Sequence, residues 1–104
     1  MEVKLFASIT EAEAVLQENQ PKLVKALGRN ICVVRRNDQI IAFENECPHM
    51  GESLHQGNIN YLGEIVCPLH SYRFNLKDGQ PAQKSCGSLK FVSVVINEEV
   101  FLVL

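Results

Sequence analysis

The sequence has no long hydrophobic run. Its longest unbroken stretch of aliphatic and aromatic residues is the final VFLVL, residues 100–104, whereas a membrane-spanning helix needs about 18 residues. The first ten residues, MEVKLFASIT, contain the acidic Glu2 and no apolar segment of the length that a signal peptide requires. We therefore expect a soluble protein located in the cytoplasm.

The sequence also has no excess of positive charge. Its 10 Lys and Arg residues against 12 Asp and Glu residues give a formal net charge of −2 and a pI near 5.9. Because nucleic acids and anionic membranes bind basic protein surfaces, we expect neither as a partner. A glycine-rich nucleotide loop is lacking too, so the sequence does not predict a site for NADH or flavin.

What the sequence does contain is a series of short strand patterns. Its 104 residues correspond to one domain, which we expect to span residues 1–104. The TEAE sequence at 10–13 matches a capping box and predicts a short N-terminal helix over about 11–19. The remainder predicts an all-β protein of about eight short strands in a small antiparallel sandwich or barrel. The clearest strands lie at residues 1–6, 22–27, 31–36, 39–43, 72–76, 90–96 and 100–104, with turns at 28–30, 37–38, 78–79 and 97–99.

Four cysteines and three histidines are the residues with metal-binding chemistry. In a reducing compartment, cysteines bind metal or react more often than they form disulfides. Cys32 lies in the strand sequence ICVV and is expected to be a buried, unreactive thiol. Cys86 lies in a loop whose position the sequence leaves undefined. His55 has no thiol near it and is expected at the surface.

Cys47, His49, Cys67 and His70 form a repeated pattern. Each of two loops, ECPHMG and VCPLHS, offers one thiol and one imidazole, with a proline beside the thiol. Such a set suits either a tetrahedral zinc ion or an iron–sulfur cluster. In the first loop a single residue separates Cys from His, so the two side chains bind one ion only with difficulty. Two facing loops would instead place Cys47 and Cys67 on one iron, and His49 and His70 on a second iron.

The pattern C-x-H, seventeen residues, C-x2-H, together with CPHMG, resembles the Rieske 2Fe–2S family. The run from Ile31 to Gly79 is similar to the ferredoxins of that family, with Leu54, Gly57 and Phe74 at matching places. The resemblance implies a Rieske-type sandwich or barrel with a cluster-binding subdomain, whose loops lie at about 45–80. It also implies one 2Fe–2S cluster per chain, with four ligands at Cys47, His49, Cys67 and His70.

Departures from respiratory members of the family bear on the redox potential. Those members have hydroxyl donors two and four residues after the second His, where this chain has Tyr72 and Phe74. They also have an extra cysteine in each loop, paired as a disulfide, where this chain has Glu52 and Leu69. Rieske potentials range from roughly −150 to +300 mV. Since hydrogen bonds to the cluster favour its reduced form, we predict roughly −100 mV rather than +200 mV.

Two further departures concern the backbone. Ser71 stands where the family usually has glycine after the second His, and it is strained if that position needs a positive φ. The segment AQKSCGSLKF, residues 82–91, lacks the proline that is usual in the third loop over the cluster.

A chain that holds a redox cluster and no substrate site is an electron carrier rather than an enzyme. Rieske oxygenases need a second iron site of two His and a carboxylate, which His55 alone would not supply. We expect a ferredoxin that transiently binds a flavin-dependent reductase and a terminal oxygenase or other redox acceptor. Two alternatives remain open: a Rieske-like small subunit of a larger oxidoreductase such as assimilatory nitrite reductase, and a zinc-stabilised interaction module.

Docking is expected at the tip formed by His49 and His70, through a small and weak interface. Acidic residues near this tip would guide the partner electrostatically. These residues are Glu44, Glu46 and Glu52.

Overall fold

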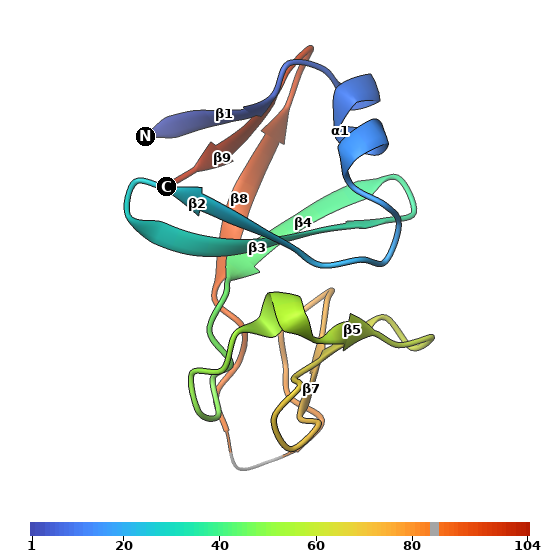
Figure 1. The fold of residues 1–104 in the computed structure, drawn as a ribbon, viewed down its shortest axis with the longest axis vertical. Helices are drawn as coiled ribbons and strands as arrows, with labels where there is room; N and C mark the ends of the chain where they lie inside the picture. The colour runs from blue at the N-terminus through green and yellow to red at the C-terminus, as the bar shows by residue number, and fades with distance from the viewer. Residues whose placement is uncertain (84–85) are drawn as a thin grey trace.

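The computed structural model describes residues 1–83 and 86–104, which contain nine β-strands, one α-helix and one 3-10 helix (Figure 1). The expected all-β class with a single short N-terminal helix is confirmed. The elements are β1 (Glu2–Phe6), α1 (Ile9–Val15), β2 (Lys22–Ala26), β3 (Arg29–Arg36), β4 (Gln39–Glu44), η1 (Leu54–Gln56), β5 (Asn58–Ile59), β6 (Glu64–Val66), β7 (Arg73–Asn75), β8 (Phe91–Ile96) and β9 (Val100–Val103).

Six strands form one antiparallel sheet in the order β1-β9-β8-β4-β3-β2. Its two halves meet where β4 pairs with β8, and that pairing involves only two residues of each strand. The strands twist and the sheet curls at this short junction, and β8 runs from the β3–β4 region up to β9 and β1 at the top of the molecule (Figure 1). The result is the small sandwich that the sequence predicted.

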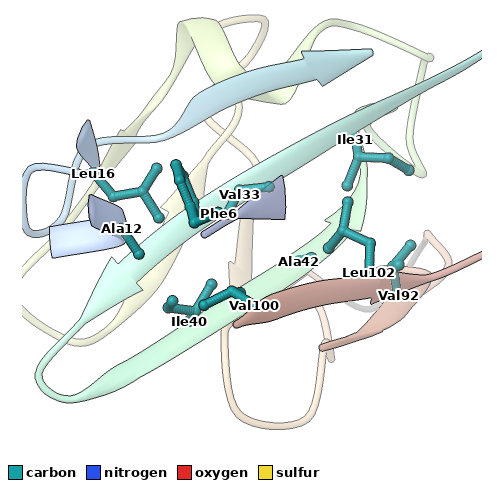
Figure 2. Close-up of a cluster of buried hydrophobic side chains, with 10 residues drawn as sticks. All are labelled: Phe6, Ala12, Leu16, Ile31, Val33, Ile40, Ala42, Val92, Val100 and Leu102. Carbon is teal, nitrogen blue, oxygen red and sulfur yellow. The ribbon is translucent and has the colours of Figure 1, made fainter. Parts of the chain in front are cut away.

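The first core lies between the two halves of the curled sheet (Figure 2). Strands of both halves contribute to it, and α1 covers it with Ala12 and with Leu16, the residue that follows the helix. Apolar burial of this kind is the main stabilising term of a small domain. The core consists of Phe6, Ala12, Leu16, Ile31, Val33, Ile40, Ala42, Val92, Val100 and Leu102.

The second core lies on the opposite face of β3. Ile31 and Val33 point into the first core, whereas Cys32 and Val34 point into the second, and all four are fully buried. Both faces of β3 are covered, which explains why ICVV has no polar residue. Cys32 is therefore buried as expected, and burial raises the pKa of its thiol to about 12.

A three-stranded sheet, in the order β5-β6-β7, covers the second core and forms the smaller subdomain at the bottom of Figure 1. Most of the side chains it buries are apolar, and two cysteines of the repeated pattern lie among them. The second core consists of Cys32, Val34, Phe43, Cys47, Leu54, Ile65, Cys67, Phe74, Leu76 and Leu89.

The position of a hairpin turn was predicted correctly where the turn contains a residue that favours a left-handed backbone. β3 and β4 join through the two-residue turn 37–38, with Asn37 at φ 55°. The turn between β2 and β3 consists of Leu27 (φ 52°) and Gly28 (φ 74°) and so lies earlier than the predicted 28–30. A leucine carries no turn signal, so the sequence pattern placed this turn too late.

The helix begins and ends earlier than expected. It spans Ile9–Val15 rather than 11–19, and its N-cap is Ser8 rather than Thr10, with which TEAE begins. The Ser8 hydroxyl accepts a hydrogen bond from the backbone N–H of Glu11 at 3.1 Å. The helix ends because Leu16 has an extended backbone and packs in the first core. No helix in the described residues is both long and apolar enough to span a membrane.

Two strands of the small sheet lie in segments that the sequence predicted as loops. β5 has two residues and β6 has three, too few for a recognisable alternating pattern. Gly57 approaches β6 so closely that a Cβ atom there would lie 1.9 Å from the carbonyl oxygen of Val66. Glycine is therefore required at position 57, where the chain packs against Val66, the residue before Cys67.

Candidate metal centre

The first loop joins β4 to η1 and carries Cys47 and His49. The backbone N–H of Cys47 donates to the carbonyl of Glu52 at 2.8 Å, and the N–H of Gly51 donates to the carbonyl of Cys47 at 2.7 Å. Gly51 has φ 74°, a left-handed conformation that glycine adopts without strain. These bonds hold the backbone on both sides of the Cys-Pro-His sequence.

A buried amide anchors the base of this loop. Asn45 is 4% exposed and is the one buried polar residue in the described part of the chain. Its side-chain oxygen accepts the backbone N–H of His55 at 2.8 Å, and its NH2 group donates to Nδ1 of the His55 ring at 2.8 Å. The expectation that His55 is a surface residue was therefore wrong, because His55 is half-buried and helps to fix the loop.

The second loop joins β6 to β7 and has the same closure. The N–H of Cys67 donates to the carbonyl of Tyr72 at 2.7 Å, five residues ahead, as in the first loop. His70 and Ser71 have φ of 64° and 55°, so both lie in the left-handed region. Ser71 corresponds to Gly51 of the first loop, and the strain expected for a serine at this position is present.

The two corresponding positions give a matched test of this strain. A left-handed backbone at a non-glycine residue lowers the stability of the folded protein by about 1–2 kcal/mol. Glycine avoids this strain, but its greater freedom in the unfolded chain takes back about 0.5–1 kcal/mol of the gain. Ser71→Gly should therefore stabilise the protein by about 0.5–1 kcal/mol in urea unfolding. Gly51→Ser, where no atom lies within 4 Å of the new Cβ, should destabilise it similarly. A loss of stability in Ser71→Gly would show that the serine side chain makes a compensating contact.

The four side chains of the repeated pattern come together as two pairs of like kind. Cys47 and Cys67 are both buried in the second core, and the Cys47 thiol lies close enough to raise the pKa of Cys67. The rings of His49 and His70 lie with their centroids 5.8 Å apart and their planes at 64°. Sulfur therefore lies beside sulfur and imidazole beside imidazole, which is the sorting that the spacing predicted.

The sulfur pair has the chemistry of a metal site. Burial, with a smaller contribution from the Cys47 thiol, raises the pKa of Cys67 to about 11. Two adjacent buried thiolates repel each other and lack solvation, so their joint ionisation needs a cation beside them. Cys47 and Cys67 would hold a ferric ion as thiolates, and its positive charge would offset their repulsion once their protons are released.

The imidazole pair also fits a metal. Nδ1 of His49 is buried and has no hydrogen-bond partner among residues 1–83 and 86–104. A buried polar atom is almost always paired, so an unpaired ring nitrogen in such a place suits a metal ligand. In the same residues, no three His, Cys, Asp or Glu side chains surround a common point. The arrangement thus gives no support to the single zinc ion, which needs four ligands, whereas each ion of a two-iron cluster takes two from the protein.

The expected third loop, residues 82–91, passes beside the first loop. Residues 84–85 of that segment lie outside the described residues. Cys86 is half-buried against the second core, where burial and then the charge of Cys47 raise the pKa of its thiol. A Cβ on Gly87 would lie 3.8 Å from Pro48. Cys86 is thus a neighbour of the cysteine pair.

Two contacts of the site were missed from the sequence. Asn45 anchors the first loop, and the ring of Tyr72 stacks on that of His49, with centroids 3.8 Å apart and planes at 13°. A single asparagine after a strand and a tyrosine before one have no distinctive pattern. Both contacts join segments distant in sequence, so no local signal would have revealed them.

Comparison with proteins of known sequence finds one matching family model and several relatives. A family model described as Rieske [2Fe-2S] domain matches residues 7–91. The oxygenase subunit of carnitine monooxygenase from Acinetobacter baumannii is 30% identical over 84 residues, which is 80% of this chain and 23% of that subunit. Ferredoxin CarAc of Metapseudomonas resinovorans is 33% identical over 72 residues, covering 64% of this chain and 65% of the ferredoxin. This chain therefore spans about a quarter of the oxygenase subunit's length.

Solved structures agree with the sequence comparison. The ferredoxin of carbazole 1,9a-dioxygenase from Nocardioides aromaticivorans IC177 has a TM-score of 0.80 and 28% identity, over 98% of this chain and 96% of that one. A ferredoxin from a complex of reduced oxygenase and oxidized ferredoxin in carbazole 1,9a-dioxygenase has a TM-score of 0.80 and 30% identity, over 97% and 91%. A putative nitrite reductase small subunit, 18% identical with a TM-score of 0.78 over 100% and 99%, shares the fold. With a match over most of its length and this arrangement of cysteines and histidines, the chain belongs to the Rieske 2Fe–2S domain family and carries that family's cluster.

Proposed function

We propose that this chain is a one-electron carrier whose 2Fe–2S cluster is held by its two ligand loops. Cys47 and Cys67 would bind one iron through sulfur, and His49 and His70 would bind the other through nitrogen. The observation that carries the proposal is the pairing of like side chains: two neighbouring buried cysteines, and two imidazoles with their centroids 5.8 Å apart. Similarity to dioxygenase ferredoxins over nearly the full length of both chains supports the carrier role.

The ligand types determine how readily the site accepts an electron. When bound, the cluster takes up one electron, and imidazole ligation sets its potential within roughly −150 to +300 mV. Hydrogen bonds to sulfur raise the potential within this range. The backbone N–H of Leu69 lies near the Cys67 sulfur and opposes the rise in the pKa of that thiol. Phe74 is fully buried and has no hydroxyl to donate.

The reduction potential should therefore lie in the lower part of the family's range. We expect roughly −100 mV rather than +200 mV, because hydroxyl donors are lacking at Phe74 and no disulfide joins the two loops. Protein-film voltammetry measures this value directly. A potential clearly above zero would contradict this explanation.

Electron uptake itself tests the proposed function. Titration of the purified protein with dithionite should consume one electron per chain, and reoxidation should return it without loss of iron. A protein that takes up no electron is not a carrier. The native size separates the carrier from the small-subunit alternative, because a stable complex with a larger oxidoreductase would elute far above 11.7 kDa.

The proposed partners are a flavin-dependent reductase and a terminal oxygenase or similar acceptor, bound in turn at the histidine edge. His70 and Pro68 are exposed there, and Met50 on the neighbouring loop is 63% exposed. Among the expected acidic residues, Glu46 is exposed, whereas Glu44 forms an ion pair with Arg29. A ferredoxin of similar sequence has been seen in complex with its oxygenase, which supports this mode of action.

A further inference from the structure

Tyr72 contacts both ligand loops at once. Its backbone carbonyl accepts the N–H of Cys67 at 2.7 Å and so closes the second loop. Its ring lies flat on the imidazole of His49 in the first loop, with centroids 3.8 Å apart and an interplanar angle of 13°. Tyr72 therefore closes the second loop with its backbone and contacts the first loop with its ring.

We propose that Tyr72 is a positioning residue that fixes the ring orientation of His49 and thereby makes the two histidine ligands inequivalent. This inference rests on the proposed function, in which His49 binds iron. The structure already separates the two rings: His49 is half-buried with Nδ1 shielded, whereas His70 is exposed. Among the described residues, the stack on Tyr72 involves His49 and not His70.

The physical reason lies in the torsion that rotates the ring. The χ2 angle of histidine has broad, two-fold minima, and a rotation by half a turn exchanges Nδ1 with a carbon atom. A parallel aromatic ring at 3.8 Å permits in-plane displacement of the imidazole but opposes its tilting. The stack therefore holds the plane of the His49 imidazole before the metal arrives and opposes the tilting through which the ring would flip. Such pre-organisation strengthens binding by reducing its entropy cost.

The first loop offers no equivalent contact. Glu52 occupies the position that corresponds to Tyr72, because its carbonyl accepts the N–H of Cys47. Its carboxylate instead accepts the backbone N–H of Ser53 at 3.0 Å. The two loops are thus closed by the same backbone hydrogen bond but differ in the side chain at the accepting residue. The ring of Tyr72 covers the imidazole of His49. The covered ring would be the fixed ligand, and the exposed ring of His70 the one that meets a partner.

The test compares Tyr72→Phe, which keeps the ring, with Tyr72→Leu, which removes it. Outer partners of metal ligands typically contribute 10–100-fold to metal affinity, so Tyr72→Leu should lose iron to a chelator about 10–100-fold faster than wild type. Tyr72→Phe should match wild type. Pulsed EPR of the reduced protein should show that the hyperfine coupling of one histidine nitrogen changes in Tyr72→Leu while the other stays constant. Tyr61→Leu is the matched control, since Tyr61 is 90% exposed and should have no effect.

Three outcomes would overturn the inference. Unchanged nitrogen couplings in Tyr72→Leu would show that the ring does not orient His49, and equal defects in the Phe and Leu variants would assign the effect to the hydroxyl. In wild-type apoprotein, the ring current of Tyr72 should move the NMR signals of the His49 ring protons upfield, a readout that needs neither cluster nor variant. Unshifted signals would contradict the stack. Absence of any histidine coupling in wild type would instead refute the proposed ligands themselves.

Discussion

Replacing Cys67 with serine should give a folded protein that has lost most of its iron. The Cys67 sulfur is buried beside that of Cys47, and a two-thiol site that loses one thiol loses half of its negative charge. Serine has a harder, far less acidic donor, which suits this metal chemistry poorly. Since even outer partners of a ligand contribute 10–100-fold, removal of a ligand should lower iron retention by more than about tenfold. Iron analysis and the visible spectrum measure the effect.

Cys86→Ser is the matched control for this variant. Cys86 is a half-buried neighbour of the cysteine pair, but it lies outside the two loops. The Cys86→Ser protein should therefore keep the two irons per chain of a 2Fe–2S cluster. Full iron content in Cys67→Ser, or loss of iron in Cys86→Ser, would mean that the ligands are assigned to the wrong cysteines.

Replacing Gly57 with alanine should have the largest effect on the fold. The new Cβ would lie 1.9 Å from the carbonyl oxygen of Val66 and 3.2 Å from that of Leu54. Both neighbours are backbone atoms, and Val66 is paired with Asn58 in the small sheet, so neither moves without breaking hydrogen bonds. We expect a destabilisation of about 3 kcal/mol or more, at the upper end of overpacking effects. Urea unfolding of the apoprotein measures it.

The clash should also impair the metal centre, because Val66 immediately precedes Cys67. Gly87→Ala is the control, since its Cβ would make an ordinary 3.8 Å contact with Pro48. That change should alter the free energy of unfolding by less than about 0.5 kcal/mol. Equal stability of the two variants would show that β5 and β6 are not packed as closely as described.

The features that the sequence predicted are those that depend on few neighbouring residues. The two-residue turn at Asn37 needs only a left-handed asparagine. The four candidate ligands form a spaced motif, and the strain at Ser71 was predicted because related sequences usually have glycine at that position. Burial of Cys32 follows from an apolar strand without polar interruptions.

The features that were missed depend on contacts between distant segments. β5 and β6 exist because the small sheet closes over the second core, not because of an alternating pattern. His55 was predicted at the surface because its partner, Asn45, lies ten residues away beyond a turn. The stack of Tyr72 on His49 spans both loops and becomes visible only once the loops face each other.

Pulsed EPR of the reduced wild-type protein with isotopically labelled histidine tests whether two imidazoles bind the same iron. If His49 and His70 bind one iron and the two cysteines the other, two histidine nitrogens should couple to the unpaired electron in a protein with two irons. Coupling to one nitrogen or to none, or a colourless protein with a single metal ion, would contradict the account.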